Sequence, residues 1–353
     1  MVENCVLEGR GGSVNRRGMA LCAASAVLFG LSTPAASRLA LRMNAFSLAG
    51  LLYLGAARAV LPFARTVWPS GAAVRRAAPR LAVAIVAGGA MGPVLLAVGL
   101  RQAPASTVSL LLNLELVFTT ILAVVVFHEH LGHRVIAGTT LVVAAGGILA
   151  WSGDTRLRWG ALIIAGACLC WAVDNGVTAK LDELAPVHIT LAKGTVAGGA
   201  NLLIGLLLGH SPSGWAIPAA LLVGGVGYGA SITLWVAGAR ELGAARGQLV
   251  FATAPFVGAV ASWLILGEAV HTRQLLSLLI ALCGVGFVLR SDHQHDHRHL
   301  LVEHEHDHTH GDGHHHNHDH EPVAGRHVHP HRHPAMAHAH AHLPDLHHRH
   351  DHA

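Results

Sequence analysis

Long apolar stretches dominate the first 290 residues of the chain. A bilayer core about 30 Å thick requires about 20 apolar residues per helix. Ten stretches of roughly this length follow one another, with short connections rich in Gly, Pro, Arg or Asp. They span residues 19–39, 46–64, 80–100, 104–127, 134–152, 158–179, 186–208, 216–238, 246–266 and 272–290. The longest connection, WPSGAAVRRAAPR, precedes the third stretch. We therefore predict an all-α integral membrane protein with ten transmembrane helices.

The two halves of this region resemble each other. RRGMALCAASAVLFGLSTPAASRLA aligns with RWGALIIAGACLCWAVDNGVTAKLD at an offset of 142 residues. RQAPASTVSLLLNLELVFTTILAVVVFHEHL aligns with RELGAARGQLVFATAPFVGAVASWLILGEAV at an offset of 139. Because each half has five helices, an odd number, the halves must have opposite orientations in the membrane. Inverted repeats are typical of secondary transporters, with the binding site near the midplane. We expect a segment 1–17, five-helix repeats at 18–152 and 158–290, and a tail at 291–353.

Two motifs carry a resemblance to a known family. NLELVFTTILAVVVFHEHL (113–131) resembles the fourth-helix motif of EamA-type transporters of the drug/metabolite transporter superfamily, and ATAPFVGAVASWLILGEAV (252–270) resembles its second-half counterpart. The resemblance covers about 18–290. It implies carrier-type transport of small metabolites, commonly export, without ATP hydrolysis, and the sequence has no P-loop motif. The family often has Pro after the Glu of the first motif. Leu116 stands there, whereas Pro255 is kept in the second half, so we expect a straighter fourth helix.

Ionisable residues inside predicted membrane helices are hypotheses of function, because burying a charge in a bilayer is costly. Glu115 lies in the middle of the fourth helix. It can ligate a cation, carry a proton or pair with a cationic substrate. It can also form a structural pair, and Arg58 in the second helix is the natural partner. Arg58 can instead contact an anionic substrate. The resemblance also places Glu and Arg at these two points.

Other polar residues extend this set of substrate-binding candidates. Lys193 lies near the inner end of the seventh helix, where it can bind substrate or reach the interface, and Asp174 lies near the inner end of the sixth. Asn113 and Asn201 lie mid-helix, where they can hydrogen-bond a substrate or bridge helices.

HEHLGH (128–133) would bring His128, Glu129 and His133 together only if the helix continued. Gly132 favours a break in the helix. A metal gate at this point is therefore not expected.

Residues 291–353 differ from the rest of the chain. They hold 24 of the 30 histidines and ten of the 20 acidic residues. Without hydrophobic periodicity they cannot bury a core, so we expect a disordered tail. Neutral imidazole suits Ni, Zn, Co and Cu(II), and the lack of Cys argues against a Cu(I) site. The predicted metal ligands are the densest histidines, His304, His306, His308, His310, His314, His315, His316, His318 and His320. A pH-sensing tail and a tract without function remain open.

Charge patterning restricts the function further. Lys and Arg in segments placed inside outnumber those outside by twelve to six, which places both termini in the cytoplasm of a cell inner (plasma) membrane. No basic patch is interleaved with aromatics, which excludes nucleic acid as a partner. No nucleophile and base are arranged for catalysis, so an enzyme is not expected. The expected partners are the lipid bilayer and a small-molecule or metal-ion substrate, with a homodimer left open.

The sequence thus predicts a secondary transporter, an exporter of small metabolites or of divalent metal ions, whose cytoplasmic tail binds transition metals. It needs no resident cofactor. The alternative is a membrane-anchored metal buffer or sensor with little transport.

Overall fold

The computed structural model describes residues 16–65, 68–127, 132–151, 155–178, 181, 184–209, 212, 214–242, 247 and 250–289, together with four strands between 293 and 342. The chain divides into two units, Met1–Ser291 and Asp292–Ala353.

Every described element of the first unit is a helix. The α-helices are α1 (Arg16–Ala40), α2 (Ala45–Ala64), α3 (Gly71–Ala84), α4 (Gly92–Gly99), α5 (Ala105–Leu111), α6 (Leu114–Phe127), α7 (His133–Ala150), α8 (Thr155–Thr178), α9 (Pro186–Ala192), α10 (Gly198–Leu207), α11 (Ala216–Val223), α12 (Ser231–Leu242), α14 (Ala254–Leu266) and α15 (Thr272–Leu289). Three π-helical segments, η1 (Ile85–Met91), η2 (Lys193–Ala197) and η3 (Gly224–Ala230), join α3 to α4, α9 to α10 and α11 to α12.

Helices occupy all ten predicted positions. Eight described helices are long and apolar enough to cross a membrane, and the shorter apolar helices Ala254–Leu266 and Thr272–Val288 occupy the last two positions. The prediction of an all-helical membrane protein is confirmed for the described part of this unit. Of the ten predicted spans, eight correspond to helices of full membrane-spanning length and two correspond to shorter apolar helices.

The third helix begins earlier than the sequence predicts. The segment WPSGAAVRRAAPR was expected to be a connection, but α3 begins at Gly71. Ser70 accepts a hydrogen bond from the backbone N–H of Ala73 at 3.2 Å, which caps the helix. Pro79 lies within α3. Apolar length alone missed this start, because the first turns are amphipathic and extend beyond the apolar stretch.

The fourth helix is broken, so the expectation of a straighter helix is wrong. It ends as α5 at Leu111 and resumes as α6 at Leu114. The Asn113 side chain donates to the carbonyl of Leu110 at 3.0 Å, and the Cys168 thiol on α8 contacts the carbonyls of Leu111 and Leu112 at 3.7 and 3.8 Å. Asn113 and Cys168 thus supply partners for carbonyls at the break, and no proline is needed there.

Irregularities recur at the offset of the internal repeat. The π-helical segments η1 and η3 begin at Ile85 and Gly224, which are 139 residues apart. Turn residues precede α6 at Leu112–Asn113 and α14 at Ala252–Thr253, which are 140 residues apart, within one residue of the repeat offset of 139. The two halves therefore share their deviations from ideal helix as well as their sequence pattern.

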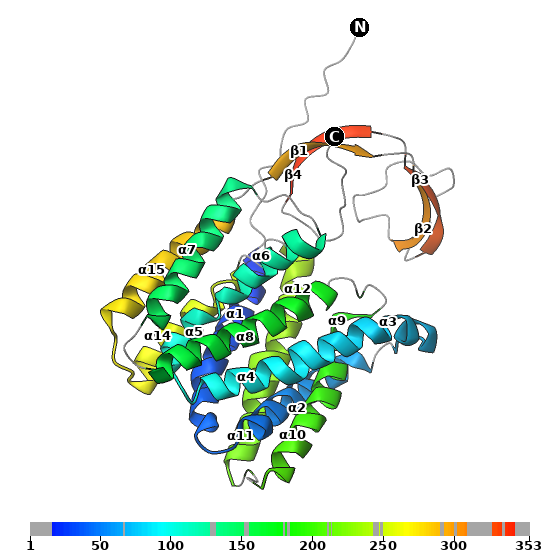
Figure 1. Cartoon of the computed structure of the whole chain (residues 1–353). Helices are drawn as coiled ribbons and strands as arrows, with labels where there is room; N and C mark the ends of the chain where they lie inside the picture. Colours follow the sequence, from blue (N-terminus) through cyan, green and yellow to red (C-terminus); the bar gives the residue numbers. More distant parts are fainter. Residues whose placement is uncertain are drawn as a thin grey trace. The chain divides into compact units, whose positions relative to one another are not determined.

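Small residues allow helices of the bundle to pack closely. Helices α7 and α15 lie side by side (Figure 1). A Cβ atom at Gly138 of α7 would lie 2.5 Å from the carbonyl oxygen of Gly284, and a Cβ atom at Gly284 would lie 2.7 Å from that of Gly138. This reciprocal contact requires glycine on both helices, as expected for close packing within a membrane.

The HEHLGH segment (128–133) connects the end of α6 to the first residue of α7. His128, Glu129 and His130 lie outside the described residues. Gly132 has extended backbone angles, φ −64° and ψ 149°, and α7 begins at His133. The helix does not continue through Gly132, as predicted.

The second unit contains two antiparallel two-stranded sheets. Strand β1 (His293–His299) pairs with β4 (Met336–His342), and β2 (Val302–His308) pairs with β3 (His327–His333). These four segments lie within the tail that the sequence predicts to be disordered, and disorder of the tail as a whole stays a prediction. Their histidines alternate with other residues, the period of an extended strand. In the register, six histidines of β1 and β2 stand opposite histidines: His293–His342, His295–His340, His297–His338, His304–His331, His306–His329 and His308–His327.

Candidate functional site: an ionic cluster in the helical bundle

An ion pair joins the sixth and seventh membrane helices. The Lys193 ammonium, at the start of η2, lies 2.5 Å from the Asp174 carboxylate on α8. The two side chains are only 16% and 5% exposed. Thr178 donates a second hydrogen bond to Asp174 at 3.0 Å. Lys193 is therefore held by a buried partner, and the alternative in which it reaches toward the interface is not the one observed.

Glu115 lies beside this pair, in the first turn of α6. The Asn175 side-chain amide on α8 donates to Oε1 of Glu115 at 2.7 Å. Among the described residues, none hydrogen-bonds to Oε2. Glu115 is half-buried and Asn175 is exposed, so this carboxylate keeps one acceptor oxygen available to a ligand.

We call Glu115, Asp174, Asn175 and Lys193 the ionic cluster. Arg58 is not part of it. Its side chain is exposed on α2, and Glu115 is held by Asn175 instead of the expected Arg58. The sequence predicted a Glu115–Arg58 pair because both residues lie well inside membrane helices. It does not show which face of each helix carries the side chain.

The two mid-helix asparagines contact backbone. The Asn201 side chain on α10 donates to the carbonyl of Ala90 in η1 at 3.2 Å, which bridges two helices. Asn113 is engaged at the break of the fourth helix. Asn201 therefore bridges helices, as one of the two alternatives predicts, whereas Asn113 bonds to a carbonyl of its own membrane helix, which was not predicted.

Sequence reasoning missed the side chains that surround the ionic cluster. The Tyr53 hydroxyl on α2 and the Trp171 indole on α8 both donate to the carbonyl of Gly88 in η1, at 2.7 and 3.2 Å. A Cβ atom at Gly88 would collide with the carboxylate of Asp174. The signals available in the sequence were two aromatic residues with polar tips inside predicted spans, Tyr53 and Trp171, and a separate Gly-Gly step at 88–89 in the third span.

Three further aromatic rings continue from Tyr53. The rings of Tyr53 and Tyr228 have centroids 5.9 Å apart. Phe29 lies 5.5 Å from Tyr228 and 5.2 Å from Phe251. We call Phe29, Tyr53, Tyr228 and Phe251 the aromatic cluster. Phe29 and Phe251 are half-buried, whereas both tyrosines are buried.

Only some of the predicted metal ligands lie among the residues that the structure describes. No group of three or more His, Cys, Asp or Glu residues suited to a metal occurs among the residues that the structure describes. His304, His306 and His308 lie in β2. His310, His314, His315, His316, His318 and His320 lie outside the described residues.

Comparison with known proteins identifies the helical region. The model of the EamA-like transporter family matches residues 16–151 and 158–290. The chain belongs to the EamA-like transporter family. It is a multi-pass membrane protein. The expected family resemblance is confirmed, and the His-rich tail lies outside both matched segments.

Two other proteins are similar to this EamA-like chain. A protein of Methanothermobacter thermautotrophicus named "Uncharacterized transporter" is 29% identical over 208 residues, which cover 56% of this chain and 60% of that relative. A solved structure titled "Crystal structure of protein" aligns with a TM-score of 0.55 at 17% identity and covers 76% of this chain and 94% of that chain. The latter likeness shows the fold alone.

Glu268 has a structural task in this EamA-like fold. Its carboxylate accepts from the backbone N–H groups of Ala105 and Ser106 at 2.7 and 2.9 Å, and from the Ser106 hydroxyl at 2.5 Å. Gln274 donates to the hydroxyls of Ser106 and Thr107, both at 2.9 Å. Glu268 therefore caps the first turn of α5 from the end of α14 and fixes the fourth helix to the ninth.

Replacing Glu268 by Gln is expected to destabilise the protein by about 1–3 kcal/mol. The amide loses the charge that strengthens these hydrogen bonds and leaves a donor facing N–H groups. Thermal unfolding of the purified protein in detergent measures the effect. Glu241→Gln is the matched control, because Glu241 pairs with a largely exposed Arg17 at 3.4 Å and such pairs contribute little. Equal unfolding temperatures for the two variants would contradict the capping role.

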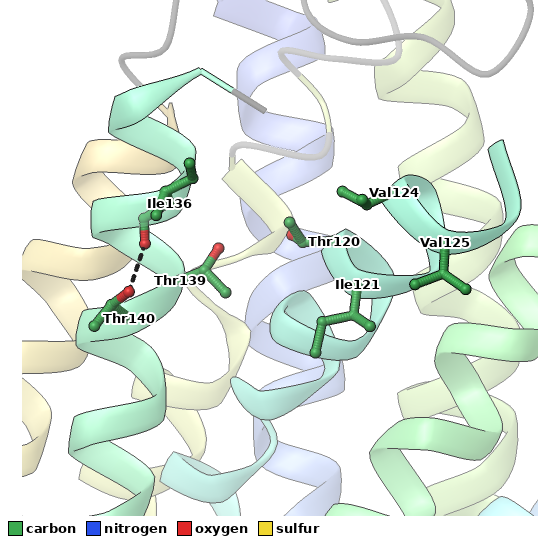
Figure 2. Close-up of a pocket in the computed structure, with 7 residues that line it drawn as sticks. All are labelled: Thr120, Ile121, Val124, Val125, Ile136, Thr139 and Thr140. Atoms are coloured by element: carbon green, nitrogen blue, oxygen red, sulfur yellow. Dashed lines mark hydrogen bonds between the residues drawn. The ribbon is translucent and has the colours of Figure 1, made fainter. Parts of the chain in front are cut away.

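A separate pocket between α6 and α7 lacks the chemistry for a charged substrate. Its volume is about 270 Å³, and Figure 2 shows aliphatic and threonine side chains of the two helices around it. The lining residues are Thr120, Ile121, Val124, Val125, Ile136, Thr139 and Thr140. None of them is ionisable, and Ile121, Val125 and Ile136 are 47–65% exposed. Such an apolar, open surface on membrane helices suits lipid.

Proposed function

We propose that this EamA-like protein is a secondary transporter that exports a small metabolite and binds it at the ionic cluster. One observation carries the proposal. The Glu115 carboxylate is half-buried inside the bundle, and its Oε2 atom has no hydrogen-bond partner among the described residues. An internal carboxylate of this kind is costly to keep in a membrane protein. Binding a ligand or a proton offsets that cost. The protein acts as a carrier, not as an enzyme.

The charges of the cluster favour a cationic group on the substrate. Asp174 and Lys193 neutralise each other at 2.5 Å, which leaves the Glu115 carboxylate as the remaining charge. An ionised carboxylate in a medium of low dielectric constant requires a positive partner. An ammonium group on the metabolite supplies that partner when substrate is bound. A proton supplies it when the site is empty, which would couple export to proton entry.

Divalent metal export is the second candidate. The 24 histidines of residues 291–353 favour it, and we propose that the tail binds Ni, Zn, Co or Cu(II). The register of its strands supports this, since cross-strand partners lie on one face of a sheet. A dehydrated divalent ion within the bundle would need several ligands. Three grouped ligands of the usual types are not found among the described residues, so an organic substrate is the first candidate.

We also propose that the transporter lies in the inner (plasma) membrane with both termini in the cytoplasm. The twelve-to-six excess of Lys and Arg on the inner segments supports this orientation. The tail then meets cytoplasmic metal before any export. Protease added to inside-out vesicles is expected to remove the tail, and the same treatment of right-side-out vesicles is expected to leave it intact. Cleavage only in right-side-out vesicles would contradict this orientation.

Cells that produce the full chain are expected to accumulate a small amine-bearing metabolite in the medium, relative to cells without it. Mass spectrometry of the medium measures this. An amine is expected because the Glu115 carboxylate of the ionic cluster has no cationic partner among the described residues. Unchanged metabolites in the medium together with lower cell metal would favour the second candidate instead.

Removing the tail tests whether metal ions are exported or are only bound by the tail. We expect that a chain ending at Ser291 keeps its metabolite export and that purified full-length protein binds several Ni or Zn ions that the truncated protein does not. Elemental mass spectrometry of the purified proteins and of metal-loaded cells gives both quantities. Lower cell metal with the full chain, lost on truncation, would favour metal export. Higher cell metal that depends on the tail alone, without metabolite export, would favour a membrane-anchored metal buffer.

A further inference from the structure

The two halves of the bundle approach each other in the same way at two equivalent positions. At one, the glycine Gly88 of η1 faces the Asp174 carboxylate of α8 so closely that a Cβ atom would collide with it. At the other, a Cβ atom on Gly227 of η3 would lie 2.5 Å from Cβ of Ser32 on α1. Gly88 and Gly227 are 139 residues apart, and Ser32 and Asp174 are 142 apart. These are the two offsets of the internal repeat, so Ser32 takes the place of Asp174.

The chemistry at the two positions differs. The same offsets match each charged or amide side chain of the ionic cluster to an uncharged residue: Glu115 to Ala254, Asp174 to Ser32, Asn175 to Thr33 and Lys193 to Leu51. All charges of the cluster thus occupy one of the two equivalent positions. The fold offers two half-sites, of which one is ionic and the other is neutral.

The neutral position is aromatic. The offset of 142 matches Trp171 to Phe29, and Phe29 packs against Tyr228 and Phe251 with ring centroids 5.5 and 5.2 Å apart. Phe29 and Phe251 are half-buried, in contrast to the buried Tyr53 and Tyr228. This half-site can bury an apolar group but cannot neutralise a charge.

Tyr53 connects the two half-sites. Its hydroxyl donates to the carbonyl of Gly88, 2.7 Å away, beside Asp174. Its ring lies 5.9 Å from that of Tyr228. The ionic cluster and the aromatic cluster are therefore the two ends of one continuous set of side chains, with Tyr53 between them.

We propose that the substrate is a small molecule with an ammonium group at one end and an apolar body at the other, and that Phe29 and Phe251 set its specificity by binding the apolar body. This inference rests on the proposed function, because it takes Glu115 as the partner of the ammonium group. The two halves of the fold then have different roles: one holds the charge of the substrate and the other selects its size and hydrophobicity.

Binding of two amines to the purified full chain in nanodiscs tests the inference. Phenethylamine has both ends, and ethylamine has the ammonium group with almost no apolar body. Phenethylamine is expected to bind about tenfold more tightly than ethylamine, because one aromatic contact within a buried site contributes roughly that factor in affinity. Phe29→Ala is expected to remove that difference and to leave ethylamine affinity within about twofold. Calorimetry against empty nanodiscs measures both.

The controls separate this inference from the proposed function. Phe29→Leu and Phe251→Leu keep apolar volume, so they maintain folding and are expected to show the same selective loss for phenethylamine. If Phe29→Ala and both Leu variants weaken the two amines equally, or weaken neither, the apolar half-site is overturned while Glu115 can still bind the ammonium group. If Glu115→Gln leaves the affinity for both amines unchanged, the proposed function itself fails.

Discussion

Replacing Glu115 by Gln is expected to abolish export, with a loss of at least about 100-fold in rate. Gln is nearly isosteric with Glu and keeps an oxygen that can accept from Asn175, at 2.7 Å in the native protein. The fold should therefore persist. Gln has no charge to pair with a cationic group and cannot carry a proton. A charge-assisted hydrogen bond inside a site of low dielectric constant is strong enough to account for a loss of this size.

The measurement is the rate at which the exported metabolite appears outside cells that contain equal amounts of each protein. Glu241→Gln is the matched control, because it removes a carboxylate that pairs with Arg17 near the surface. Glu115→Asp, which keeps the charge on a shorter side chain, should recover part of the activity. Export by Glu115→Gln at the native rate would show that Glu115 is structural and that the substrate binds elsewhere.

Replacing Lys193 by Met is expected to give the largest loss of stability, about 3–5 kcal/mol. Removing one partner of a buried ion pair leaves the other charge without compensation. Asp174 is only 5% exposed, and Thr178 alone would remain as a side-chain donor to it. Unfolding of the purified protein in detergent by heat or denaturant measures the loss.

The double variant Lys193→Met with Asp174→Asn supplies the control. Because neither residue is then charged, the double variant is expected to recover most of the stability. Export should still be weakened, since Asn175 follows Asp174 on α8 and holds Glu115. A double variant as unstable as Lys193→Met would contradict this account, because the loss would then come from the packing of the lysine stem and not from an unpaired charge.

The sequence predicted the helical architecture because apolar length is a local property. Ten apolar stretches, the offset of the repeat and the two motifs at 113–131 and 252–270 are visible without coordinates. The start of α3 was missed, because Ser70 caps an amphipathic turn outside the apolar stretch. The break between α5 and α6 was also missed. Its carbonyls are satisfied in part by the thiol of Cys168, which is remote in the chain.

The charged residues of the site were visible one by one, and their arrangement was not. Glu115, Asp174 and Lys193 stand out because ionisable residues are rare in the apolar stretches. Which of them pair depends on the rotation of each helix about its axis. The packing of α8 against α6 and η1, and of η1 against η2, decided that Lys193 meets Asp174 and that Asn175, not Arg58, meets Glu115.

The sequence by itself thus determined that this chain is a membrane protein with a repeated helical region and a histidine-rich tail, since composition and periodicity are sufficient for both. Only the tertiary structure decided that one of two equivalent positions is ionic and the other aromatic. The physical reason is that the pairing of Gly88 with Asp174 and of Gly227 with Ser32 exists only where helices of the two halves cross.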